Sequence, residues 1–159
     1  LEILSLCIIV QVYDQTKSHN RLERLSWDIF VVPHHGSYTF FSEKSREDAK
    51  DSPDERSMNI LERGNEGCEL VCSSRLIKEK NYSDDDPPHI QAVTHYRKTA
   101  KNKNGKFTCL MDDSNKNNPE PLVFRFTDGG PQRKSIGTAT AVAITQKASS
   151  STPRYGLKL

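Results

Sequence analysis

The sequence has few apolar residues and no long run of them. Only 34% of its 159 residues are hydrophobic, and the mean hydropathy is −0.72. The longest apolar stretch, residues 1–13, is too short to cross a bilayer and is interrupted by polar residues. It also lacks the basic leader and small-residue cleavage site of a signal peptide. We therefore expect no membrane span, and one thin core with long polar loops.

The sequence also has no large excess of positive or of negative charge. Lys and Arg number 23 and Asp and Glu number 21, which leaves a net charge of +2. This near-balance argues against a strongly cationic nucleic-acid clamp and against an acidic disordered tail. Four lysines between residues 98 and 106 could contact phosphates, although the solvated end of a helix is the simpler interpretation.

Cysteine is scarce and shows no metal-site spacing. Cys7, Cys68, Cys72 and Cys109 include no CxxC pair and no zinc-knuckle pattern. All four lie in apolar runs, so we expect buried, reduced thiols in a cytoplasmic protein. The P-loop, GxSxG and Rossmann fingerprints are missing too, which removes the commonest nucleotide-binding and serine-hydrolase sites.

The order of apolar and polar segments predicts an α/β fold. The expected strands are residues 1–13, 26–32, 68–72, 107–111 and 122–126, the last two as an antiparallel pair, and the expected helices are residues 15–25, 53–64 and 89–100. Residues 40–52 are expected to form an exposed polar excursion. The packed domain would cover residues 1–130, followed by a loosely ordered extension over residues 131–159.

One segment carries a chemical signal: residues 28–37, DIFVVPHHGS. A buried strand would bring His34 and His35 to its carboxyl end, where α/β proteins commonly place sites. Neutral imidazole is the commonest metal ligand, but the side chains of consecutive residues diverge. We therefore expect one ring to bind a metal ion and the other to face a substrate. Gly36 would permit the tight turn, and Ser37 would offer a hydroxyl and an N–H to an anion.

Residues 27–37 resemble the strand and loop written aDvlkvpHHGS in metallo-β-lactamase-fold hydrolases, most closely in the competence-related, DNA-internalisation branch. The resemblance implies the C-terminal half of an αββα sandwich. It implies two zinc ions in the intact site, with His35 as a metal ligand and His34 as a catalytic group that contacts the substrate or protonates the leaving group. Gly36 and Ser37 would bind the substrate, a phosphoester that could belong to a nucleic acid.

The sequence departs from the family at several points. The first metal-binding motif of the family, HxHxDH, is absent from all 159 residues. Either it lies upstream of Leu1, as the uncapped start of the first apolar run favours, or the chain is an inactive relative. The family's metal-bridging Asp would correspond to Asp14, although Tyr13 replaces the usual Gly and a helix N-cap is the alternative role. His89 follows a proline instead of preceding it, so it receives no ligand role.

The resemblance predicts where the candidate site residues should lie in the sheet, and a structure can test this. Residues 28–32 should form a central strand, with His34 and His35 at its carboxyl end and Asp14 ending a neighbouring strand at the same edge. If residues 28–32 form an edge strand or a helix, the family interpretation fails. Three functions stay open: part of a zinc-dependent hydrolase, an inactive interaction or regulatory module with the same fold, and a nucleic-acid-binding domain that uses residues 98–106.

Overall fold

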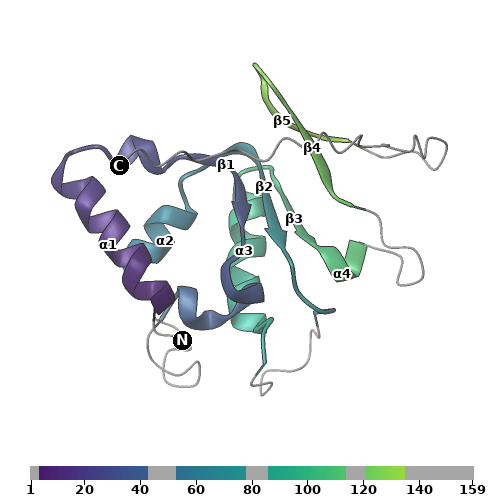
Figure 1. Cartoon of the computed structure of the whole chain (residues 1–159), viewed down its shortest axis with the longest axis horizontal. Coiled ribbons are helices and arrows are strands. Elements are labelled where there is room, and N and C mark those ends of the chain that lie inside the picture. Colours follow the sequence, from purple (N-terminus) through teal and green to yellow (C-terminus); the bar gives the residue numbers. More distant parts are fainter. Residues whose placement is uncertain (1–3, 43–52, 78–85, 114–120, 135–159) are drawn as a thin grey trace, which may run out of the picture.

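The computed structural model describes residues 4–42, 53–77, 86–113 and 121–134. Helices alternate with strands along the chain, and short 3₁₀ turns (η) flank the first strand (Figure 1). The elements are α1 (Leu4–Ser18), η1 (Leu22–Leu25), β1 (Trp27–Val31), η2 (Pro33–Gly36), η3 (Tyr38–Phe40), α2 (Glu55–Leu61), β2 (Gly64–Cys72), α3 (Ile90–Asn102), β3 (Lys106–Cys109), α4 (Leu110–Asp113), β4 (Val123–Thr127) and β5 (Gly130–Lys134).

The main sheet has three parallel strands in the order β1-β2-β3. The α/β prediction is therefore confirmed, but the central position expected for residues 28–32 is wrong. Among the described strands β2 is central, because β1 and β3 pair with its two edges. The expected pairing of residues 107–111 with residues 122–126 is also wrong, since β4 forms an antiparallel hairpin with β5. This hairpin extends to Lys134. Residues 135–159, the rest of the predicted extension, lie outside the described residues.

The first apolar run forms a helix instead of the expected strand. Leu6 and Tyr13 are buried, and Ile9 between them packs against the core. Their spacing of three and four residues places them on one face of a helix. A continuous apolar run satisfies this spacing and that of a buried strand equally well, so periodicity alone does not separate the two. The helix expected at residues 15–25 is in fact the end of α1 followed by the separate turn η1.

The polar excursion expected at residues 40–52 begins inside the core. Phe40 and Phe41 are buried, and their ring centroids lie 4.8 Å apart in an edge-on arrangement. Phe41 also lies 5.2 Å from the ring of Tyr96 on α3. Through these ring contacts η3 packs against α3, on the face of the sheet that the helices cover. Residues 43–52, the rest of the predicted excursion, lie outside the described residues.

The two faces of the sheet differ. Cys68, Leu70 and Cys72 alternate along β2 and are buried in one cluster with residues of α2, α3 and η3. On the opposite face Glu69 is paired with Arg133 of β5 at 2.8 Å, and Val31 is 68% exposed. All four cysteines of the chain are free, and the prediction of burial is confirmed for three of them, with Cys7 half-buried.

Helix α2 begins at an acidic cap. The N-cap residue is Asp54. Its carboxylate accepts hydrogen bonds from the backbone N–H groups of Arg56 at 2.8 Å and Ser57 at 3.4 Å. The Arg56 guanidinium donates a further bond of 2.7 Å. The Arg56 side chain is the main reason that the pKa of Asp54 lies below its ordinary value, and the two backbone donors add to the effect.

We expect Asp54→Ala to lower the free energy of unfolding by about 1 kcal/mol at pH 7, because N-cap substitutions typically cost this much. The charge contributes stability above the ordinary carboxyl pKa of about 3.9, and this stability is lost as pH falls through the lower folded pKa. Asp54→Asn keeps an acceptor oxygen without the charge, so it should lose less stability at pH 7. Urea unfolding at pH 7 and pH 3 measures both effects, and an unchanged acid dependence in Asp54→Asn would contradict the role of the charge.

None of the described helices is long and apolar enough to cross a membrane.

Candidate functional site

The candidate site lies at the carboxyl edge of the parallel sheet. His34 and His35 follow β1 within η2, and Ser73 follows the neighbouring strand β2. Because parallel strands end at the same edge, residues 38 positions apart in the sequence meet there. The prediction that the two histidines lie at the carboxyl end of the strand is confirmed.

The backbone of this loop is left-handed at three consecutive residues. The φ angles are 48° at His34, 56° at His35 and 86° at Gly36. Glycine adopts this region freely, whereas other residues pay roughly 1–2 kcal/mol. Such backbone strain concentrates at functional sites, where the surrounding structure holds it in place.

Two backbone hydrogen bonds hold the strained turn. The Ser37 N–H donates to the His34 carbonyl at 3.0 Å, and the His89 N–H donates to the Gly36 carbonyl at 3.0 Å. Close packing adds to this, because a Cβ on Gly36 would lie 3.1 Å from Cβ of Pro88 and 3.3 Å from Sγ of Cys72. The loop is thus docked between β2 and the start of α3.

The His35 ring is oriented by the end of β2. Its Nδ1 makes a short hydrogen bond with the Ser73 carbonyl. A carbonyl oxygen only accepts, so Nδ1 carries the proton and the lone pair of the neutral ring lies on Nε2. No described residue hydrogen-bonds to Nε2. A backbone carbonyl on one ring nitrogen is how metal-ligating histidines are commonly fixed, so His35 has the tautomer a ligand needs.

His34 is exposed and its side chain makes no hydrogen bond with any described residue. Its ring is therefore available to a molecule that approaches the sheet edge. Ser37 is buried, and its Oγ accepts from the N–H of Thr39 at 3.4 Å and from the Thr39 hydroxyl at 3.2 Å. The N–H and the hydroxyl of Ser37 thus both make hydrogen bonds within the loop. The predicted contact of Ser37 with a substrate stays a prediction.

His89 is the residue of this site that the sequence analysis missed. It caps α3, and its Nδ1 accepts a 2.9 Å hydrogen bond from the N–H of Tyr38. Together with its own N–H bond to Gly36 it clamps the loop from both sides. His89 thus acts as a positioning residue. A contact across 51 residues leaves no local pattern that could have predicted it.

His95 is half-buried and packs against aromatic residues that follow the loop. Its ring centroid is 4.8 Å from that of Phe41 and 6.4 Å from that of Tyr38. Burial lowers the pKa of the imidazole, and the charge of Lys98 lowers it further. The ring is therefore kept neutral where it packs against the aromatic residues.

Asp14 does not occupy the position that a bridging ligand requires. It lies inside α1 instead of ending a strand, so the structural premise of its metal role is wrong, and so is the alternative of an N-cap. Its carboxylate pairs with the guanidinium of Arg56 at 3.3 Å. Within the described ranges no three His, Cys, Asp or Glu side chains are grouped closely enough to hold a metal ion. These residues thus supply one oriented imidazole and an exposed second one.

No family model, curated protein or solved structure matches this chain. The resemblance to metallo-β-lactamase-fold hydrolases therefore depends on the HHGS segment and on the geometry around it.

Proposed function

We propose that this chain forms part of a metal-dependent hydrolase of the metallo-β-lactamase kind that cleaves phosphoester bonds. His35 would be one metal ligand through Nε2, and His34 would contact the substrate or protonate the leaving group. The observation that carries the proposal is the hydrogen bond from His35 to the Ser73 carbonyl, since it leaves Nε2 as the unprotonated nitrogen at an accessible sheet edge.

The face of the sheet opposite the helices is only partly covered by described residues, through the Arg133–Glu69 pair from β5, and this supports the proposed architecture. Parallel sheets are normally covered on both faces. Here Ile29 and Val71 are half-buried on the face opposite the helices, and Val31 is 68% exposed. An αββα sandwich would cover this face with a second sheet. By the test stated for the resemblance, the edge position of β1 counts against it within the described residues. The proposal therefore requires a further strand, from residues outside them, that pairs with the free edge of β1.

Zinc fits this site only in part. His35 presents a suitable donor, whereas Asp14 is held by Arg56 and is no longer proposed as a ligand. The other ligands would belong to an HxHxDH segment outside this sequence. A dinuclear zinc pair, when bound, lowers the pKa of water toward about 7 and supplies hydroxide. The chain's own contribution is to hold the His35 ring and to expose His34 beside it.

The substrate and compartment follow from the same proposal. A phosphodiester, including that of a nucleic acid, is the substrate that the competence-type resemblance favours. Three buried free thiols fit a reducing cytoplasm.

We expect the 159-residue chain to have no phosphodiesterase activity, and the polypeptide encoded by the complete gene to be active with zinc. In that polypeptide His35→Ala should lower zinc content and reduce turnover of bis-p-nitrophenyl phosphate by at least about 100-fold, since even residues that only orient a metal ligand contribute about 10–100-fold. His34→Ala is the matched control: it should retain zinc while kcat falls. Metal analysis and initial rates measure the two effects separately.

Two results would contradict the proposal. Turnover by the 159-residue chain that His35→Ala abolishes would show that the site is complete without further ligands. A gene with an initiation codon directly before Leu1, or without HxHxDH upstream, would favour the inactive interaction module. That alternative is consistent with the lack of a three-ligand group in the described ranges.

A further inference from the structure

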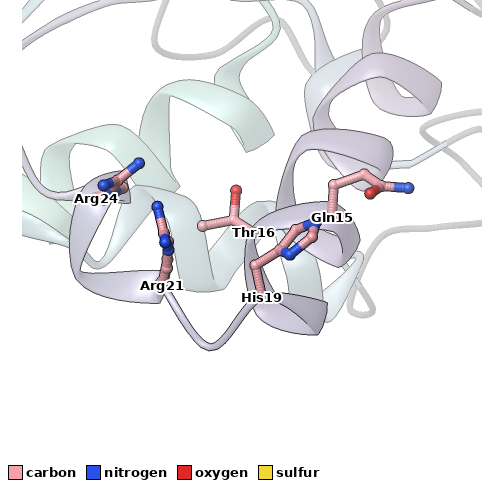
Figure 2. Close-up of a pocket in the computed structure, with 5 residues that line it drawn as sticks. All are labelled: Gln15, Thr16, His19, Arg21 and Arg24. Atoms are coloured by element: carbon pink, nitrogen blue, oxygen red, sulfur yellow. The ribbon is translucent and has the colours of Figure 1, made fainter.

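A second concave site lies at the opposite end of β1. Gln15, Thr16 and His19 at the end of α1, together with Arg21 and Arg24 around η1, line an open pocket of about 510 Å³ (Figure 2). Small-molecule sites typically have volumes of about 300–1,000 Å³. The five residues of β1 separate this pocket from the histidine loop, a span of about 16 Å at about 3.3 Å per residue. The pocket is therefore distinct from the proposed hydrolase site.

The pocket is built on a rigid helix end. Asn20 has a φ of 54°, and its N–H donates to the Lys17 carbonyl at 2.9 Å. The Arg21 N–H then donates to the Thr16 carbonyl at 3.0 Å. This pair of bonds is a Schellman cap, which occupies carbonyls that otherwise present negative charge at a helix end. The cap thus reduces the repulsion that an anion would meet there.

The turn η1 fixes the backbone position of the second arginine, Arg24. The Arg24 N–H donates to the Arg21 carbonyl at 3.0 Å. Arg21 is the cap residue directly before η1 and Arg24 lies within it, and both side chains line the same pocket. Figure 2 shows both arginines on the η1 side of Thr16, with His19 and Gln15 on the α1 side.

The two arginines of this pocket are exposed, and the carboxylate of Glu23 lies between them in the sequence. Neither Arg21 nor Arg24 forms an ion pair or a side-chain hydrogen bond with the described part of the chain. Among the described residues Asp14 pairs with Arg56, Asp28 accepts from Asn65, and Glu23 forms no ion pair with either arginine. The two exposed guanidinium groups without an ion-pair partner among the described residues make an anion the ligand that this pocket favours.

We propose that this pocket binds a small molecule through a phosphate monoester group. Guanidinium forks match the oxygens of phosphate in paired hydrogen bonds, and two such forks suit a doubly charged group. A nucleic-acid strand would need cations along an extended track, together with aromatic stacking surfaces. Here the cations form one cluster beside Gln15, whose amide can contact the organic part of the ligand.

Isothermal titration calorimetry with the full 159-residue chain tests this site, with adenosine monophosphate and inorganic phosphate as probes. Arg21→Gln/Arg24→Gln should weaken the binding of both probes at least about tenfold, because the charge-assisted hydrogen bonds are lost. Lys98→Gln/Lys101→Gln removes the same charge from the exposed side of α3 and should change the affinity less than about twofold. Arg21→Lys/Arg24→Lys keeps the charge without the forks and should give an intermediate loss.

The affinities of the different probes distinguish the possible ligands. Equal affinity for the two probes assigns recognition to the phosphate group, and tighter binding of the nucleotide adds a contact with its organic part; both support the site. Absence of saturable binding up to about 10 mM, or equal weakening by the α3 double variant, would overturn it. A 12-nucleotide single strand that binds more tightly than either probe, with the steep salt dependence of several phosphate contacts, would also overturn it in favour of a nucleic-acid surface.

Discussion

Phe41→Ala is expected to lower the free energy of unfolding by about 3–5 kcal/mol, the usual cost of removing a buried aromatic ring. Phe41 is fully buried, and its ring contacts those of Phe40, Tyr96 and His95 at centroid distances of 4.8, 5.2 and 4.8 Å. The cavity would open where η3 meets α3. Because small domains are stable by only about 5–15 kcal/mol, this loss is a large share of the total.

Phe126→Ala is the matched control for this prediction. The same atoms are removed, but Phe126 lies on the β4–β5 hairpin and is 73% exposed. Surface substitutions of this kind change stability by about 0.5 kcal/mol or less. Urea unfolding monitored by circular dichroism compares the two variants. Similar losses in both would show that η3 is not part of the core.

Gly36→Ala is the second change with a large expected effect. At a φ of 86° an alanine costs about 1–2 kcal/mol of backbone strain. Its Cβ would also crowd Pro88 and Cys72 at 3.1 and 3.3 Å, and overpacking of this kind adds about 1–3 kcal/mol. We expect a total loss of about 2–5 kcal/mol from these two effects. The loop that presents His35 would shift with the backbone.

Gly67→Ala separates the two contributions. Gly67 in β2 has a φ of 74°, but nothing lies within 4 Å of an added Cβ. It therefore carries the strain without the crowding and should cost about 1–2 kcal/mol. Chemical denaturation of the two variants gives the difference directly. Equal losses would mean that the loop is not packed against Pro88 and Cys72.

The sequence predicted the elements whose signals are local. An unbroken Ile- and Val-rich run ended by Pro33 indicated β1, and the apolar spacing of Ile90, Val93 and Tyr96 indicated α3. In both segments the local pattern and the tertiary environment favour the same structure. The apolar run over residues 68–72 likewise predicted buried cysteines, which the structure confirms for Cys68 and Cys72.

The errors occurred where a local pattern fits two structures. The apolar run of α1 suits a buried strand as well as a helix, and only its packing of Leu6 and Tyr13 decides between them. Phe40 and Phe41 stand next to a polar stretch, so composition assigned them to solvent. Their burial is set by aromatic partners on α3, which are more than 50 residues away in the sequence.

The sequence by itself determined that two histidines follow a strand, because strand, proline and glycine signals are all read within ten residues. The burial expected for that strand is wrong, since the residues of β1 are half-buried or exposed. Only the tertiary structure decided what those histidines can do. The order β1-β2-β3 brings Ser73 to the His35 ring, and the start of α3 brings His89 to the backbone of the loop. In the tertiary structure Asp14 lies in α1 and pairs with Arg56. Strand order and helix docking depend on contacts between distant residues, which no local spacing encodes.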